Sequence, residues 1–364
     1  MNTATVTWTY YQNYGTILQA YALQQVIIKL GHNNKIIDDS MIIRKKYRFA
    51  FIPDKIKDIC RIVFHLNNVY ARKSIIRNRE YKQFKMKYLH IDFNTFPVKN
   101  LDKRYDIFIC GSDQIWSPTE KIFDDFYFLE FTQKRKVAYA PSLGKAFLPD
   151  WYKKRVKRLL KNFDFISVRE SKGAELLSEL IGYELEVVLD PTLLLNSPEW
   201  DKVINGECTD IGKYILVYML TPNDIYIKVV MDFAKKYNLK VCILGTSEEY
   251  LHLDAENIFC GPDRFLQLIK QAEIVFTDSF HGTIFSILFH KEFYTFKRFS
   301  DQSSLNQNSR IDNLFEQLDI CGRLIDSRNL DIVGASPVLD YQKIDIRLNM
   351  LRMTSFAFLK KALS

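Results

Sequence analysis

The segment at residues 272–297, AEIVFTDSFHGTIFSILFHKEFYTFK, constrains the fold more than any other part of the chain. Residues 273–277 are β-branched and aromatic, as in a buried strand, and residues 278–280 favour a turn. An apolar helix is expected to begin at His281, and a second strand is expected at residues 293–296. This order of strand, tight loop, helix and strand is typical of a parallel α/β sheet.

The loop inside this segment predicts an anion-binding site. Asp278 or Ser279 can cap the helix, which places the ionisable His281 and the small Gly282 at its positive end. Ligands of open α/β sheets bind at the carboxyl edge of the strands, and a helix start attracts anions. The same helix end disfavours an imidazolium, so a bound anion would have to offset it if His281 donates a proton. A histidine that only caps the helix or packs in the core is the competing interpretation.

Alternating strands and helices along the rest of the chain predict two α/β domains with a cleft between them. The 364 residues are 47% hydrophobic and 26% charged, which is enough for two cores. We expect an N-terminal domain at residues 1–200 and a C-terminal domain at 210–330, with the boundary in the polar stretch at 195–212. A final helix is expected at 340–364, and one arrangement open to it is to pack back on the N-terminal domain.

The charge of the chain favours an anionic partner, because the formal net charge is +8 and the sequence pI is about 8.9. The excess is concentrated at residues 41–104, a predicted helical insertion with 17 Lys or Arg against five Asp or Glu. This insertion is either a solvated surface or a surface for an anionic membrane or a lipid-linked phosphate. Nucleic acid is not expected as a partner, since no nucleic-acid motif accompanies the charge.

Several classes of protein receive no support from the sequence. No signal peptide and no run of about 18 apolar residues is present, so a cytoplasmic protein is expected, with peripheral contact at the inner membrane face as an open alternative. The six cysteines form no C-x-x-C pair, which favours buried free thiols in a reducing compartment. There is no H-E-x-x-H, G-x-S-x-G, P-loop or G-x-G-x-x-G motif, so we expect no protein-bound catalytic metal and no dinucleotide site.

Polar clusters follow several other predicted strands, and a parallel sheet would place them along one edge. A guanidinium at one such strand end, Arg169, can form two parallel hydrogen bonds to a carboxylate or a phosphate of a ligand, or can instead pair with Glu170 or Asp190. Lys297 and Arg310 add further cations. Cations near one histidine at a helix start predict a site for a small polyanion whose reaction needs a proton. The remaining candidates in these clusters are Asn13, Tyr14, Gly15, Ser112, Asp113 and Gln114.

The chain resembles the polysaccharide pyruvyl transferase family over nearly its whole length. The resemblance is carried by short segments that occur in the family's order: NYGTILQAYALQ, YDIFICGSDQIW, YAPSLG, ISVRE, VLDPTLL, TDSFHGTIFSILF and SRIDNL. It implies two Rossmann-like domains facing a cleft, in a GT-B-like arrangement. The basic insertion at residues 41–104 lies outside the resemblance.

The resemblance also implies an activity and roles for the candidate residues. The family moves pyruvate from phosphoenolpyruvate to two hydroxyls of a sugar, forming a cyclic ketal and releasing phosphate, in a cell-surface polysaccharide such as an exopolysaccharide or capsule, or in its precursor. His281 would be the proton carrier, because an imidazole exchanges protons near neutral pH. No cofactor is implied besides the donor, although a divalent ion bridging the phosphate stays open, and the sugar acceptor could be linked to a lipid diphosphate. The donor would be bound by Arg169, Lys297, Ser279 and Gly282, and the acceptor side of the cleft would be lined by Asn13, Tyr14, Gly15, Ser112, Asp113, Gln114 and Arg310.

Two other functions fit the same sequence features. A GT-B glycosyltransferase that uses a nucleotide sugar would need the same fold and the same phosphate site. A non-catalytic binding protein of the glycan-assembly machinery would keep the fold with a degenerate site.

Overall fold

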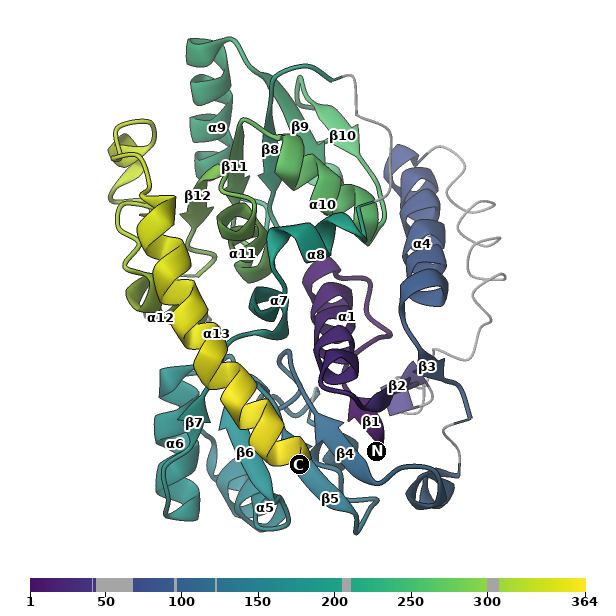
Figure 1. Cartoon of the computed structure of the whole chain (residues 1–364). Coiled ribbons are helices and arrows are strands. Elements are labelled where there is room, and N and C mark those ends of the chain that lie inside the picture. The colour runs from purple at the N-terminus through teal and green to yellow at the C-terminus, as the bar shows by residue number, and fades with distance from the viewer. Residues whose placement is uncertain (41, 44–67, 95–96, 122, 205–210, 300–307) are drawn as a thin grey trace.

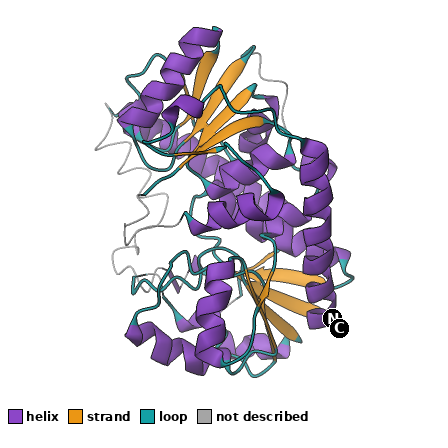
Figure 2. Cartoon of the chain, turned by 90° about the vertical axis from the view of Figure 1, so that its left-hand side faces the viewer, coloured by secondary structure: helices purple, strands orange, loops and turns teal. Residues whose placement is uncertain are grey.

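The computed structural model describes residues 1–364 except 41, 44–67, 95–96, 122, 205–210 and 300–307. It contains two parallel β-sheets, one in each half of the chain (Figure 1). Figure 2 shows the sheets at opposite ends of the molecule with helices between them.

The N-terminal sheet has the strand order β3-β2-β1-β4-β5-β6-β7, and all the pairings are parallel. Because the order reverses between β1 and β4, the carboxyl ends of these two strands form the usual ligand-binding crevice of such a sheet. Its strands are β1 (Asn2–Val6), β2 (Asn33–Ile37), β3 (Ile91–Asp92), β4 (Ile107–Cys110), β5 (Arg135–Ala138), β6 (Phe165–Val168) and β7 (Glu186–Val187). The helices of this half are α1 (Tyr14–Lys29), α4 (Val69–Tyr88), α5 (Asp150–Leu160), α6 (Ser171–Ile181), α7 (Pro191–Leu194) and α8 (Ser197–Asp201), with 3-10 turns η1 (Val98–Lys103) and η2 (Asp125–Phe128).

The C-terminal sheet repeats this plan with the order β10-β9-β8-β11-β12-β13, which reverses between β8 and β11. Its strands are β8 (Tyr214–Tyr218), β9 (Lys240–Leu244), β10 (Glu256–Ile258), β11 (Ile274–Thr277), β12 (Glu292–Phe296) and β13 (Leu324–Ile325). Its helices are α9 (Asp224–Tyr237), α10 (Pro262–Gln271), α11 (Phe280–Leu288) and α12 (Ser309–Leu318), with 3-10 turns η3 (Glu248–Tyr250) and η4 (Leu330–Ile332). The strand, loop, helix and strand expected at residues 272–297 are therefore confirmed as β11, α11 and β12.

Buried apolar side chains cover both faces of each sheet. In β4, Ile107 and Ile109 face a cluster shared with the C-terminal half, whereas Phe108 and Cys110 face a cluster on the opposite side of the sheet. This two-sided burial is what makes the strands continuous apolar runs rather than alternating ones. The predicted fold class, two Rossmann-like domains in a GT-B-like arrangement, is confirmed by these two doubly wound sheets.

Two long helices connect the halves. Helix α13 (Tyr341–Leu363) runs from the C-terminal half to the N-terminal half (Figure 1). The Tyr341 hydroxyl donates to the Lys291 carbonyl, and the Ser355 hydroxyl accepts the Leu189 N–H at 3.0 Å. In α1, the Tyr14 ring stacks on Phe265 of α10 with centroids 4.2 Å apart. These contacts hold the carboxyl edges of the two sheets in a fixed relation.

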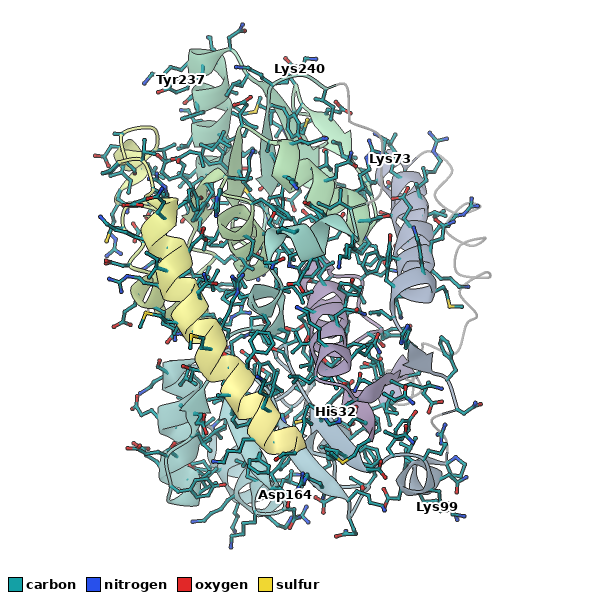
Figure 3. All side chains as sticks on the ribbon, viewed as in Figure 1. His32, Lys73, Lys99, Asp164, Tyr237 and Lys240 are labelled. Carbon is teal, nitrogen blue, oxygen red and sulfur yellow. The ribbon has the colours of Figure 1, made fainter. Side chains whose placement is uncertain are left out.

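The basic insertion is part of this framework where the structure describes it. Helix α4 contacts the C-terminal half: the Tyr70 hydroxyl donates to the Thr246 carbonyl at 3.0 Å, and Lys73 lies 5.7 Å from the Phe259 ring (Figure 3). The described part of the predicted helical insertion contains α4 and η1, and between them the short strand β3 pairs with β2 and extends the N-terminal sheet. A strand of two residues is too short to show an alternation of apolar and polar side chains in the sequence. Residues 41, 44–67 and 95–96 of the insertion lie outside the described residues.

Two further expectations concern thiols and membrane spans. Cys110, Cys242 and Cys260 are buried free thiols, as expected, whereas the free Cys321 is exposed. Among the helices that the structure describes, none combines the length and the apolar character needed to cross a bilayer.

Candidate active site

A cavity of about 470 Å³ lies between the two domains. Its walls come mainly from the loops that follow β1 and β4 on one side and β8 and β11 on the other, which are the points where the strand order of each sheet reverses. The lining residues are Trp8, Tyr11, Gln12, Asn13, Thr16, Asp113, Gln114, Leu220, Asp278, Ser279, Phe280, His281, Arg298, Asn308, Arg310 and Ile311.

His281 lies in the first turn of α11, where the local sequence fixes the helix start. The Ser279 hydroxyl accepts the Gly282 N–H at 3.3 Å and so caps the helix. A Cβ on Gly282 would come within 2.4 Å of the Thr277 hydroxyl, so only glycine allows the helix to approach the end of β11 this closely. The His281 side chain is buried, with 6% of the residue exposed, and it contributes to the cavity wall.

The start of α1 meets His281 from the opposite domain. The Asn13 side chain accepts the Thr16 N–H at 3.2 Å and caps this helix. A Cβ on Gly15 would come within 1.9 Å of His281 Nδ1, so the absence of a side chain at Gly15 makes room for the imidazole. Two helix N-termini, one from each domain, therefore converge on one cavity.

The other imidazole nitrogen faces a buried carboxylate. His281 Nε2 lies 3.4 Å from Asp190 Oδ2, and Arg169 Nη1 lies 2.6 Å from the same oxygen. Thr192 donates to Asp190 Oδ1 from its N–H at 3.0 Å and its hydroxyl at 2.6 Å. Burial alone would raise the pKa of Asp190, but His281, Arg169 and Thr192 together hold it well below the usual range. Asp190 is therefore a fixed negative charge that orients the ring, whose Nδ1 packs against Gly15.

Two arginines lie beside the ring of Phe280. The Arg169 and Arg310 guanidinium carbons lie 4.8 and 5.5 Å from the centre of its ring. Burial, and then the charge of Arg169, lower the pKa of Arg310 to about 10, which still leaves it charged at neutral pH. Arg310 and Arg298 line the cavity, whereas the buried Arg169 lies behind Phe280 and Asp190. The cavity wall of the C-terminal domain therefore carries two arginines, of which Arg298 lies 3.6 Å from the Asp278 carboxylate on the same wall.

Two carboxyl groups also line the cavity. Asp113 accepts the Thr16 hydroxyl at 2.5 Å and has a φ of 65°, a left-handed conformation that is uncommon for a residue with a side chain. Asp278 accepts the Leu220 N–H at 2.6 Å and the Thr221 N–H at 2.9 Å. Burial raises the pKa of Asp278 to about 6 despite these hydrogen bonds, so Asp278 can exchange a proton near neutral pH.

The sequence model of the family "Polysaccharide pyruvyl transferase" matches residues 13–298, which include both helix starts and His281. The chain belongs to the polysaccharide pyruvyl transferase family. The resemblance described above is thereby confirmed, and the protein is a transferase of polysaccharide biosynthesis. No curated protein matches the chain in sequence.

Three solved structures with a similar fold have names other than polysaccharide pyruvyl transferase. They include the S. aureus MnaA–UDP co-structure (12% identity, covering 96% of this chain and 90% of that chain, TM-score 0.48) and Methanocaldococcus jannaschii UDP-GlcNAc 2-epimerase in complex with UDP-GlcNAc and UDP (12%, 96% and 93%, 0.48). A third is the glycosyltransferase SnogD from Streptomyces nogalater (13%, 98% and 95%, 0.44). At these identities and scores they carry no argument about ligands.

The predicted site residues of this family member fall into three groups. Six of them line the cavity: Asn13, Asp113, Gln114, Ser279, His281 and Arg310. Gly15 and Gly282 act through their missing side chains, and the Tyr14 hydroxyl donates to the Cys260 carbonyl at 2.9 Å in the domain interface. Ser112 donates to the Ala140 carbonyl at 2.8 Å, and Arg169 supports Asp190 from behind.

Lys297 is the predicted residue that the structure does not bring to the cavity. Its N–H donates to the Ile325 carbonyl at 2.8 Å, and its carbonyl accepts the Tyr226 hydroxyl at 3.1 Å, so its backbone is held at the edge of β12. The next residue, Arg298, lines the cavity instead. Consecutive residues at a strand end point to opposite sides, so two adjacent cations cannot both face one site.

Sequence reasoning missed three features of the site. Asp190 follows β7 in the run Asp-Pro-Thr, which indicates a strand end and a helix cap but not contact with a histidine 91 positions later. Trp8 and Tyr11 follow β1, and their position just before the polar cluster at residues 12–15 was the available signal.

Proposed function

We propose that the protein transfers pyruvate from phosphoenolpyruvate to two hydroxyls of a sugar in a cell-surface polysaccharide or its precursor, forming a cyclic ketal and releasing phosphate. The observation that carries this proposal is the position of His281 between Gly15 and Asp190, on the cationic wall of the cavity. Phosphoenolpyruvate brings a phosphate and a carboxylate, and its methylene carbon must accept a proton.

The donor would bind to the C-terminal domain wall. Arg298 and Arg310 can each form charge-assisted hydrogen bonds to an anion, and the start of α11 adds backbone donors and a favourable dipole. Since Arg169 lowers the pKa of the buried Arg310, a bound anion would also relieve the repulsion between the two guanidinium groups. The donor would therefore be held most strongly next to His281.

The reaction would begin with a proton from the His281 imidazole to the methylene carbon of the donor, which leaves the central carbon electron-poor. One sugar hydroxyl then adds to that carbon and loses its proton, and the second hydroxyl forms the other C–O bond as the bond to phosphate breaks. One of the two hydroxyl protons restores His281, and the other leaves with phosphate. Asp113 and Asp278 are the carboxylates on the cavity wall that could relay these protons.

Asp190 would be a positioning residue in this scheme, because it contacts His281 Nε2 without lining the cavity. It supplies a negative charge that opposes the effect of the helix end on an imidazolium. The proposal includes no cofactor besides the donor. A divalent ion that stimulates the reaction would reach the site on the donor phosphate.

The test compares donors with the purified full-length protein. Isothermal titration should give binding of phosphoenolpyruvate and none of UDP-N-acetylglucosamine, and phosphate should be released when a glycan of the producing cell's surface is added as acceptor. Binding of the nucleotide sugar instead would favour the glycosyltransferase alternative. Binding of phosphoenolpyruvate without turnover on any glycan would favour the non-catalytic alternative.

The proposal also includes the place of the reaction. We propose a cytoplasmic protein whose acceptor is presented on a lipid diphosphate, with α4 facing the anionic membrane. Arg72, Arg79, Lys82 and Lys87 are exposed on this helix. Changing Arg72, Arg79 and Lys82 to Glu should abolish cosedimentation with vesicles that contain phosphatidylglycerol at low salt, and unchanged cosedimentation would contradict this part of the proposal.

A further inference from the structure

The two walls of the cavity differ in charge. Among the described lining residues, both arginines, Arg298 and Arg310, belong to the C-terminal domain, as does His281. The one described lining carboxylate of this domain, Asp278, lies 3.6 Å from Arg298, so the two arginines still outnumber the carboxylates of this wall. The lining residues of the N-terminal domain include no Lys or Arg, and their one charged group is the carboxylate of Asp113. An anion would therefore settle on one wall and leave the other to a neutral, polar ligand.

Two aromatic residues belong to the N-terminal wall: Trp8, which is mostly buried with 8% of the residue exposed, and Tyr11, which is partly exposed. Trp8 comes soon after β1, at the carboxyl edge of the sheet, and its ring meets that of Tyr11 edge to face with centroids 5.1 Å apart. Trp8 Nε1 is enclosed and has no hydrogen-bond partner among the described residues. A sugar ring has an apolar C–H face and polar edges, so an aromatic surface with polar groups at its border matches it.

The loop that bears these rings is held from beneath. The Asp39 carboxylate accepts the Thr9 hydroxyl at 2.8 Å, the Thr9 N–H at 3.3 Å and the Tyr127 hydroxyl at 3.0 Å. Lys85 donates to the Thr9 carbonyl at 2.7 Å, and the Tyr127 ring lies 6.3 Å from that of Trp8. The aromatic surface is thus formed before a ligand arrives, which reduces the entropy lost on binding.

Amide groups lie beside the rings. Gln12 and Gln114 both line the cavity. A Cβ on Gly144 would come within 2.2 Å of Gln114 Nε2, so the glycine makes room for this amide. The cavity of about 470 Å³ is also larger than a three-carbon donor requires, and it falls in the range of roughly 300–1,000 Å³ that is usual for drug-sized ligands.

We propose that Trp8 and Tyr11 form a platform on which a neutral pyranose ring of the acceptor stacks, with Gln12, Gln114 and Asp113 directed to its hydroxyls. The ring then lies across the cavity from His281, between the platform and the donor. This inference rests on the proposed function for the reaction it serves, but the binding of a sugar to the platform needs no donor and can be measured alone.

The test uses saturation-transfer difference NMR of the full-length protein with the methyl β-pyranosides of glucose, galactose, mannose and N-acetylglucosamine. The wild type should transfer saturation to the ring protons of at least one of them. Tyr11→Ala and Trp8→Leu should each weaken that binding at least tenfold and leave phosphoenolpyruvate affinity within twofold. Tyr183→Ala, which removes an exposed tyrosine outside the cavity lining, is the matched control and should change neither.

Two outcomes would overturn the platform. One is a wild type that binds none of the four glycosides at 50 mM, and the other is equal sugar binding by the wild type and both ring variants. Trp8→Phe guards against a folding defect, because it keeps an aromatic ring and should retain more than a third of the affinity. Failure of the proposed function would look different: sugar binding would be present and sensitive to Tyr11, while phosphoenolpyruvate would not bind.

Discussion

The two domains present the same backbone arrangement to the cavity but equip it with different side chains. In each sheet the strand order reverses beside a central strand, β1 or β11, and the next helix along the chain, α1 or α11, begins at the cavity after a loop (Figure 1). Asn13 caps α1 and Ser279 caps α11. The helix dipole is therefore available from both sides, whereas the lining arginines belong to the C-terminal side only.

This difference teaches that a helix start does not by itself decide which ligand binds. In the first turn of α1, Tyr14 lies in the domain interface and Gly15 packs against the His281 ring. Few backbone N–H groups of this turn are therefore accessible to an anion. The first turn of α11 lies on the same cavity wall as Arg298, which follows β12, and Arg310, which belongs to α12. The side chains around each helix start, rather than the backbone, separate a donor wall from an acceptor wall.

The largest expected effect tests whether the chemistry belongs to the α11 side. His281→Ala should lower turnover of phosphoenolpyruvate by about 10²–10⁴-fold, because a positioned acid is lost, while donor binding by titration persists. His290→Ala is the matched control: it removes a half-exposed histidine just past the same helix and should leave turnover unchanged. Equal rates for His281→Ala and wild type would assign His281 a purely structural role.

A buried carboxylate supports each wall, and substitution of the two should lower stability to different extents. Asp190→Asn removes the nearer of the two carboxylates beside the buried Arg169, leaving Glu170 at 3.5 Å, and should lower the free energy of unfolding by about 3 kcal/mol at neutral pH. Because the pKa of Asp190 is held below its ordinary value of 3.8, its stabilising contribution is present at neutral pH and is lost as the pH falls below that value. Denaturant titrations at pH 7 and pH 3 should show the difference between variant and wild type shrinking at pH 3.

Asp39 is the comparator on the other wall. Burial raises its pKa to about 6, so its ionised form destabilises the folded chain above that pH, and Asp39→Asn should cost clearly less than Asp190→Asn at pH 7. Equal losses for the two variants would mean that the charges on the two walls do not differ as described.

The contact between the walls gives a third prediction. Gly15→Ala places a Cβ within 1.9 Å of His281 Nδ1 and should displace the ring, lowering turnover by about 10²-fold with the fold retained. Gly182→Ala is the control, because a Cβ there meets no atom within 4 Å and its φ of 88° should reduce stability by about 1–2 kcal/mol without affecting turnover. Normal turnover in Gly15→Ala would show that His281 needs no space from α1.

Much of the fold follows from local sequence, and much of the site does not. The pattern of apolar residues at positions 272–297 and the helix cap at Ser279 specify β11, α11 and β12 through interactions within one short segment. Asp190 meets His281 only because strands distant in sequence are brought together, and no local pattern encodes that proximity. The position of Lys297 outside the cavity lining has a related reason, since which of two adjacent residues, Lys297 or Arg298, faces a cavity depends on where the strand ends.

The different positions of the lining arginines and of Lys297 give the smallest expected effect and a direct test of the donor wall. Arg310→Ala should weaken phosphoenolpyruvate binding by roughly 10–100-fold, as the loss of one charge-assisted contact is worth about 1.5–3 kcal/mol. Lys297→Ala removes the same charge from a residue outside the cavity lining, so its donor affinity should stay within about twofold of wild type at physiological salt, where distant charges are screened. If Lys297→Ala were the more damaging change, the donor would have to lie further along β12, and the division into a cationic donor wall and an aromatic acceptor wall would no longer describe the cavity.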